Sequence, residues 1–355
     1  MLVSGAFLEF HEAPHRPVGV TVPGVFHDDT PPGPEDRRQC LGESGSNGLI
    51  TLDTVTGEVR AVEWPGQEAG GELLATSLPA LAALVREVEA VASGAADPTA
   101  RGGRRGTAVA DAVIAEAEER MRAIDPALFA AHPRHPHWRT ALVVASLPWG
   151  ARPGGPEDGL AYVFEPDLVE SLGHVFDTDD EPTVRRYRPE DLPAELVHAP
   201  TRRLLTEVGL PLDVDVLGLP SEGPLTPAPG AEPHHLFLAW WADDLRISLD
   251  GTTGAVLVHD PTGGYGDLAP YLNRDLSALL YALWTYERLA TEWYHENEDD
   301  PRDDSDDETV IDPHALLLNE VDARIEAVDP EAFATPDHSW RRLAEDPYTG
   351  GFLCD

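Results

Sequence analysis

The sequence predicts an α+β fold with two tandem domains, each an antiparallel sheet with flanking helices. The chain has 355 residues, of which 42% are hydrophobic, and this length suits about two ordinary domains. A strand–turn–strand segment occurs twice, 197 residues apart, and two amphipathic helical patterns follow each copy. Short strands and helices in this order, without strict βαβ alternation, favour antiparallel sheets.

The repeated hairpin spans residues 49–59 in the first copy and 246–256 in the second. Alternating apolar residues mark its strands, because successive side chains of a strand point to opposite faces of the sheet. Gly57 and Gly254 stand at the end of the turn, where a hairpin loop often needs positive φ. Each copy therefore contains the same strand–turn–strand unit.

A helix follows each hairpin, and Ser77 and Asp275 are its expected N-caps. Their side-chain oxygens can accept a hydrogen bond from an amide of the first turn. Apolar residues then recur at helical spacing, which predicts one buried face. The expected buried positions are Leu78, Leu81, Val85 and Val88 in the first copy and Leu276, Leu279, Leu283 and Tyr286 in the second.

A second helix in each copy is expected to end at Asp125-Pro126 and at Asp329-Pro330, because Pro cannot continue the helical hydrogen bonds. A Phe and then a Trp-Arg pair follow in both copies. Four features in the same order at nearly constant spacing indicate a duplication. The expected buried positions of these helices are Ile114, Ala117, Met121 and Ile124, and Leu318, Val321, Ile325 and Val328.

The Gly/Pro-rich segment 149–158 is the expected domain boundary, so we expect domains at residues 1–150 and 155–355. The two linkers between the helices of each copy, at 93–107 and 295–308, differ in charge and are expected to be loops in solvent. The second linker is rich in carboxylates but lacks the order of ligands of a calcium loop.

The charge of the chain restricts its partners. It has 25 basic and 64 acidic residues, a net charge of −39, and every fixed cation is Arg. Such a chain repels phosphate backbones, whose binding depends on cations, so neither nucleic acid nor an anionic membrane is an expected partner. A basic protein is, because complementary potentials speed encounter.

Several classes of enzyme and targeting signal are excluded by composition. Without Lys there is no phosphate-binding P-loop, and two distant cysteines, Cys40 and Cys354, supply neither a zinc deaminase motif nor a disulfide framework. The N-terminus has no basic segment before an apolar one, and no apolar run is long enough to span a membrane. The expected location is the cytoplasm.

Four segments of the second copy occur in an order typical of one family. They are V-R-R-Y at 184–187, the segment 199–211, the hairpin strand and turn 247–254, and Y-L-N-R-D-L-S-A-L at 271–279. In this order they resemble subfamily four of the SUKH superfamily of bacterial immunity proteins. The resemblance covers residues 165–290 and rests on the ordered set. The first copy keeps the hairpin and the capped helix but lacks the upstream segment.

The resemblance implies an α+β fold whose members bind and inactivate secreted toxins of polymorphic toxin systems, often nucleases or deaminases. It implies no catalytic residues and no cofactor. We therefore expect a protein that is not an enzyme and that binds a basic toxin domain stoichiometrically, covering its active cleft with an acidic surface. A regulatory scaffold or adaptor, a role of some relatives with this fold, is an alternative.

A histidine cluster supports a second alternative. His132, His135 and His137 lie within six residues, and three imidazoles could hold zinc if a carboxylate completed the site. The alternative function is then a metal-dependent hydrolase. Pro133 and Pro136 interrupt any helical face here, which favours a surface loop without a metal.

The candidate partner-binding residues centre on Trp240 and Trp241, which follow His234 and His235 on an expected strand. Adjacent residues of a strand point to opposite faces, so one Trp can enter the core while the other stays near the surface. The other reading is that the Pro-rich loop at 219–233 covers both. The full candidate set is Trp240, Trp241, Asp243, Asp244, Asp260, Tyr265 and Asp267.

Overall fold

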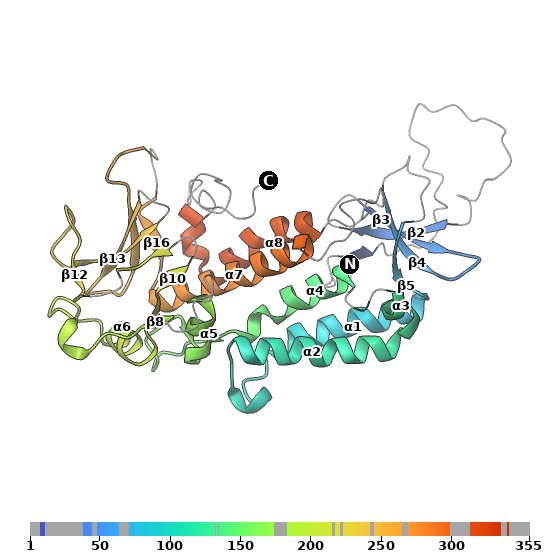
Figure 1. The fold of residues 1–355 in the computed structure, drawn as a ribbon, viewed down its shortest axis with the longest axis horizontal. Coiled ribbons are helices and arrows are strands. Elements are labelled where there is room, and N and C mark those ends of the chain that lie inside the picture. Colours follow the sequence, from blue (N-terminus) through green and yellow to red (C-terminus); the bar gives the residue numbers. More distant parts are fainter. Residues whose placement is uncertain are drawn as a thin grey trace. The chain divides into compact units, whose positions relative to one another are not determined.

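The computed structural model confirms the α+β class, with helices and antiparallel sheets (Figure 1). The described parts form a five-stranded sheet, a seven-stranded sheet and two two-stranded sheets. The structure describes residues 8–10, 38–44, 48–63, 71–131, 133, 135–173, 183–214, 217–220, 223–241, 245–264, 269–298, 313–334 and 339–340.

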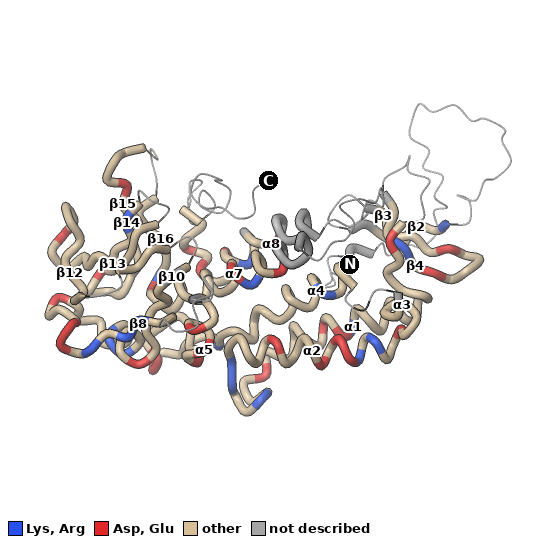
Figure 2. Tube along the Cα trace, viewed as in Figure 1, with Lys and Arg blue, Asp and Glu red and all other residues tan. Residues whose placement is uncertain are grey.

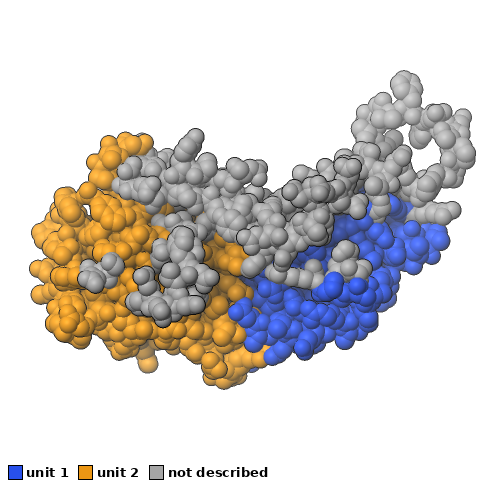
Figure 3. Space-filling model, in the orientation of Figure 1, with its two compact units in different colours: residues 1–97, 111–147, 292–319 blue, residues 98–110, 148–291, 320–355 orange. Residues whose placement is uncertain are grey.

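The chain divides into two compact units (Figure 3). Unit 1 comprises residues 1–97, 111–147 and 292–319, and unit 2 comprises residues 98–110, 148–291 and 320–355. The chain thus passes from one unit to the other next to the Gly/Pro-rich segment expected as the boundary. The exchanged segments 98–110 and 292–319 were not expected from the sequence.

Unit 1 is built on a sheet in which strands β1 to β5 lie in chain order, each antiparallel to the next. Ile50 and Leu74 of the sheet are buried with Leu81 and Leu84 of α1 and Met121 of α2. Its elements are β1 (Leu8–Phe10), β2 (Arg38–Ser44), β3 (Gly48–Asp53), β4 (Val59–Glu63), β5 (Glu72–Ala75), α1 (Leu78–Gly94), α2 (Thr107–Ile124), α3 (Pro126–Ala131) and α4 (Pro136–Ser146). The first residues of α2, up to Ala110, belong to unit 2.

Unit 2 is built on the larger sheet, in the order β10-β11-β13-β14-β15-β16, with β12 also paired to β13. Its strands are β6 (Arg152–Pro153), β7 (Tyr162–Val163), β8 (Val184–Arg185), β9 (Leu210–Pro211), β10 (Asp213–Val214), β11 (Leu217–Gly218), β12 (Thr226–Pro227), β13 (His235–Trp241), β14 (Leu245–Asp250), β15 (Val256–His259) and β16 (Tyr271–Asn273). Its helices include α5 (Pro166–Glu170) and α6 (Ala199–Arg203), and α7 (Leu276–Glu298) and α8 (Pro313–Val328) each have residues in both units. Short helical turns are η2 (Ala100–Gly103), η3 (Leu147–Trp149), η4 (Ser171–Gly173), η5 (Pro189–Asp191), η6 (Leu204–Val208) and η8 (Pro330–Phe333).

The helix caps are confirmed, and one buried stripe is corrected. Ser77 accepts a hydrogen bond from the Ala80 amide at 3.2 Å, and Asp275 accepts one from the Ala278 amide at 3.1 Å. The expected stripe of α7 is buried, but in α1 Leu78 is 43% exposed and Val85 is only half-buried. Leu78 follows the cap directly, before the helix has turned its apolar side to the core. The buried stripe of α1 is Leu81, Leu84, Val88 and Val91.

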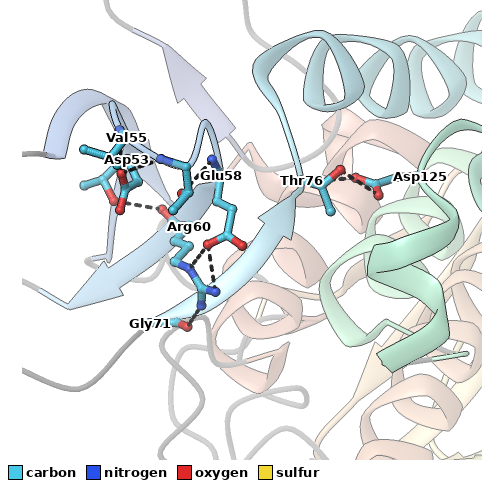
Figure 4. A network of polar contacts seen from close by, with 9 residues as sticks. Asp53, Val55, Glu58, Arg60, Gly71, Thr76 and Asp125 are labelled. Atoms are coloured by element: carbon cyan, nitrogen blue, oxygen red, sulfur yellow. Dashed lines mark hydrogen bonds and ion pairs between the residues drawn. The ribbon is translucent and has the colours of Figure 1, made fainter.

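Both hairpin turns are closed by the same hydrogen bonds. Asp53 Oδ1 accepts bonds from the Val55 and Thr56 amides (Figure 4), and Asp250 Oδ1 accepts bonds from the amides two and three residues beyond it. Gly57 has a φ of +81° and Gly254 a φ of +85°, so positive φ is confirmed at both. An aspartate that binds the turn amides and a glycine in the left-handed region together define this turn.

Irregularities of the two sheets also fall at matching positions. The β2–β3 register shifts between Cys40 and Gly42, and the β13–β14 register shifts between Phe237 and Ala239, 197 residues later. A second register shift lies in the β4–β5 pairing between Val59 and Arg60. Its counterpart lies in the β15–β16 pairing between Val256 and Leu257, again 197 residues later. A β-bulge changes which side chains face the core beyond it, so both sheets alter their pattern at the same two places.

A buried carboxylate connects the end of the second helix to the start of the first in each unit. Asp125 Oδ2 accepts a hydrogen bond from the Thr76 amide at 2.7 Å (Figure 4), and Asp329 Oδ2 accepts one from the Arg274 amide at 2.6 Å. Both carboxylates are 2% exposed. We call this contact the aspartate latch. The Asp of each Asp-Pro pair thus has a structural role, while the Pro is the residue that cannot continue the helix.

The linkers that were expected to be loops are only partly described. Residues 295–298 continue α7, so the acidic linker begins later than expected, and residues 299–312 lie outside the described residues. In the first copy, residues 100–103 form the short turn η2 between α1 and α2.

Candidate partner-binding face

The sheet of unit 2 has one face in the core and one face turned away from it. Side chains that are at most 2% exposed alternate along β13, β14 and β15: Leu236, Leu238, Ala239, Trp241, Leu245, Ile247, Leu249, Val256 and Val258. The side chains between them form what we call the outer face: His235, Phe237, Trp240, Arg246, Ser248, Asp250, Leu257 and His259. All of these are exposed or half-buried except Ser248, which is fully buried.

The bulge in β13 decides which tryptophan lies on the outer face. Strict alternation from Phe237 would place residue 239 outward and Trp240 inward, but the extra residue at the bulge makes Ala239 pair with Ile247 on the core side. Trp240 is therefore 44% exposed, while Trp241 is 1% exposed.

Trp241 must be removed from the candidate partner-binding residues. Its ring meets the ring of Trp340 edge-on, with centroids 4.9 Å apart, inside the core. The sequence argument allowed one of the two tryptophans to be buried, and Trp241 is that one. Neither is the pair covered as a whole, because Trp240 is among the exposed large apolar residues.

Trp240 is held in place by two neighbours on the outer face. The guanidinium carbon of Arg246 lies 5.3 Å from the Trp240 ring centroid, within cation–π range. The Phe237 ring meets it edge-on, with centroids 4.9 Å apart. These contacts restrict the rotation of the indole while leaving much of its surface in solvent.

Backbone pairing arranges the outer face in rows across three strands. Trp240 stands opposite Arg246, and Arg246 stands opposite His259. The next row contains Phe237 and Ser248, which pair across β13 and β14. The ring of Trp240, the guanidinium of Arg246 and the imidazole of His259 thus lie in one row. Aromatic residues and Arg are enriched in protein interfaces.

His259 is a neutral member of this face at ordinary pH. Burial lowers its pKa below the usual value of histidine, and the nearby His235 and Arg246 lower it further. Its Nε2 lies 2.6 Å from the Ser248 hydroxyl oxygen. A serine next to a histidine is the pairing of a nucleophilic site, but Ser248 is fully buried, so its hydroxyl is closed to a substrate.

Of the remaining sequence candidates, Asp260 is described and the others are not. Asp260 follows β15, and its Oδ1 accepts hydrogen bonds from the amides of Thr262 and Gly263, at 2.9 and 2.8 Å. One carboxylate oxygen of Asp260 therefore stabilises a local turn. Asp243, Asp244, Tyr265 and Asp267 lie outside the described residues.

The sequence reasoning missed Phe237, Arg246 and His259, which complete the outer face. Their strands were recognised, and pairing Trp240 across the hairpin would have indicated Arg246. The bulge that turns Trp240 outward has no glycine or proline to mark it, so the face itself was not readable from the pattern.

The two described histidines of the cluster in the first copy, His135 and His137, lie in the core. His135 is 2% exposed, and its Nε2 lies 2.8 Å from the Leu73 carbonyl oxygen. His137 is 1% exposed, and burial, with the help of His135, lowers its pKa to about 3. The expected surface loop is wrong for these two residues, and both are closed to a substrate. His132 lies outside the described residues.

Comparison with known families identifies the region that contains the outer face. A family model described as SUKH-4 immunity protein matches residues 160–346, just over half of the chain. No curated protein and no solved structure matches the chain. Within the described residues, no helix is long and apolar enough to cross a membrane. The match agrees with the ordered segments of the second copy, and the chain belongs to the SUKH-4 immunity protein family.

Proposed function

We propose that this protein neutralises a toxin by binding it stoichiometrically through the outer face of unit 2. The immunity role comes with the family, whose match includes the whole of β13–β15. The observation that carries the proposal is Trp240, which is 44% exposed although the adjacent Trp241 is 1% exposed. An exposed, well-oriented tryptophan next to an arginine is typical of the centre of a protein interface.

The contacts of Trp240 favour tight binding. Phe237 and Arg246 already restrict the indole, so little side-chain entropy is lost when a partner covers it. Truncation of a central interface tryptophan commonly costs about 2 kcal/mol or more, which is roughly a thirtyfold loss of affinity. We assign this role to Trp240.

The charge of the chain supports a basic partner. Its net charge is −39, and Figure 2 shows acidic residues along α2 and around α5. A partner with a positive surface would be attracted over about one Debye length, roughly 8 Å at physiological salt. The nuclease- or deaminase-type toxins that the family resemblance implies act on polyanions and suit this requirement.

We further propose that unit 1 contains a degenerate SUKH-like domain within residues 1–150, and that unit 2 carries the second copy within 155–355. The matching turns, register shifts and aspartate latches support this. At the register position of Trp240 the first copy has Glu43, so we assign toxin binding to unit 2.

The proposal is tested by titrating neutralisation. Increasing amounts of the full-length purified chain are added to a fixed amount of the toxin domain encoded beside it, and residual toxin activity is measured. A stoichiometric inhibitor stops the activity at about one equivalent, and calorimetry should give the same ratio. Complex formation should weaken when salt is raised, because screening reduces the attraction between opposite charges.

Two results would contradict the proposal. Complete inactivation by a small fraction of an equivalent would indicate turnover, and so an enzyme. Absence of both binding and protection against the adjacent toxin would indicate a different role, such as the regulatory adaptor considered from the sequence.

A further inference from the structure

Two histidines and a carboxylate converge at one end of the outer face. His234, His235 and Asp250 each present one ligand atom, and the three atoms lie within 4.8 Å of one another. All three side chains are half-buried, so solvent reaches them. Imidazole nitrogens with a carboxylate oxygen are a ligand set that suits zinc and neighbouring transition metals. We propose that these residues bind a divalent ion of the zinc class.

The separation of the ligand atoms is close to that of a bound state. In a tetrahedral zinc site with bonds of about 2.0–2.2 Å, ligand atoms lie about 3.3–3.6 Å apart. In the structure the three ligand atoms lie within 4.8 Å of one another. A small rotation of the imidazole side chains is enough to bring their nitrogen atoms to the shorter separation. Binding therefore requires no rearrangement of the strands.

The backbone explains why two adjacent histidines point to one place. His235 begins β13 and stands opposite Asp250 of β14. His234 precedes the strand, so it is free of strand alternation, and its carbonyl accepts a hydrogen bond from the Gly251 amide at 2.8 Å. The two imidazole rings meet edge-on, with centroids 4.6 Å apart. Sheet pairing and this extra bond hold the residues together.

One imidazole nitrogen of the group lacks a protein partner. Nδ1 of His235 is shielded from solvent and has no hydrogen-bond partner among the described residues. A buried polar atom without a partner costs about 1–3 kcal/mol. Coordination of a metal through Nδ1 would give this nitrogen a partner and so remove the cost.

The carboxylate is oriented before any ion binds. The Thr252 and Thr253 amides hold Asp250 Oδ1 at 2.8 and 3.2 Å. The same turn occurs at Asp53 in unit 1, where Arg38 stands at the register position of His235. The turn alone is therefore not a metal site. The histidines are what distinguish unit 2.

Three protein ligands leave a tetrahedral ion one further position, for water or for a side chain of a bound partner. Metal binding goes beyond the proposed function, and it is measured without a toxin. Metal binding and toxin binding can therefore fail separately.

The experiment is calorimetric titration of the metal-free, full-length chain with zinc chloride, repeated with calcium chloride. We expect one zinc site of micromolar or tighter affinity and no calcium binding at the same site. His235→Gln and Asp250→Asn should each weaken zinc binding at least tenfold. Asp53→Asn, the same substitution in the same turn of unit 1, should change it less than twofold.

Melting curves establish that each variant is folded, and His234→Gln replaces Asp250→Asn if the latter is not. Unchanged zinc affinity in both ligand variants would overturn the proposal, since the ion would then be bound elsewhere on this acidic chain. No saturable zinc binding at about 0.1 mM would overturn it as well, because three-ligand sites of this kind bind more tightly.

Discussion

The sheets of the two units have matching registers and different outer faces. Both have the same turn, the same two register shifts and an aspartate latch. Side chains at corresponding outward register positions differ in kind. Unit 2 has His235, Phe237, Ser248 and His259 where unit 1 has Arg38, Cys40, Thr51 and Val62. At the backbone register position of Trp240, the sequence of unit 1 has Glu43.

The comparison separates what builds the sheet from what the sheet presents. Inward positions such as Ile50 and Ile247 are fully buried and aliphatic in both units, because a β-sheet must cover one face to be stable. Outward positions vary in burial, since Thr51 is 1% and Ser248 0% exposed whereas Trp240 is 44% exposed. In unit 2, outward positions carry aromatic, cationic and imidazole groups, so we assign toxin binding to unit 2.

The largest effect is expected at the aspartate latch. Asp125→Ala and Asp329→Ala should each lower the free energy of unfolding by about 3 kcal/mol, because each leaves a buried backbone amide without its charged acceptor. Urea unfolding of the full chain, with hydrogen exchange read separately in α1 and α7, measures the two losses.

Asp125→Asn and Asp329→Asn are the matched controls, since an amide oxygen can still accept the backbone bond and the loss should be smaller. If one alanine variant kept the free energy of unfolding of the original chain while the other was destabilised, the two contacts would not be structural equivalents.

A second difference between the units is the dependence of stability on pH. The pKa of His137 is lowered to about 3, whereas the unfolded chain binds that proton near pH 6.5. Below pH 6.5 only the unfolded state gains the proton, so stability falls as the pH falls towards 3. The loss between pH 7 and pH 5 is roughly 2 kcal/mol.

His137→Leu should remove this part of the pH dependence, measured as the difference between unfolding free energies at pH 7 and pH 5. Unit 2 has Ser339 at this position, which donates a hydrogen bond to the Ala269 carbonyl at 3.0 Å and does not titrate in this range. An unchanged difference in the leucine variant would show that His137 is protonated in the folded state.

The smallest effect distinguishes the two turns. Gly57→Ala should cost about 1 kcal/mol, from the left-handed backbone alone, because no atom lies near the added methyl group. Gly254→Ala should cost about 1 kcal/mol more, because its methyl group would overlap the His198 ring. Thermal unfolding of the pair gives both values, and equal losses would show that His198 moves away freely.

Local chemistry made much of the fold predictable. Gly57 and Gly254 indicated the turns, Ser77 and Asp275 the helix starts, and the Asp-Pro pairs the helix ends, because each of these acts within a few residues. Leu78 was misassigned because periodicity does not show where a helix first meets its core. The exchange of segments 98–110 and 292–319 between units depends on tertiary packing, which a local pattern does not contain.

The candidate site was predictable only in part, for the same reason. Trp240 was identified from its adjacent aromatic neighbour, but choosing between it and Trp241 required the bulge between Phe237 and Ala239. Arg246 and His259 join the face through pairing across strands, which brings together residues that are not close in sequence.

The most direct test of the central claim compares two exposed apolar side chains, one from each unit. Trp240 is 44% exposed and Leu78 is 43% exposed. The affinity of the adjacent toxin domain is measured for the full chain with Trp240→Ala or Leu78→Ala. We predict that Trp240→Ala weakens binding at least tenfold, about 1.4 kcal/mol, and that Leu78→Ala changes it less than twofold. A loss at Leu78 with none at Trp240 would contradict the assignment of recognition to unit 2.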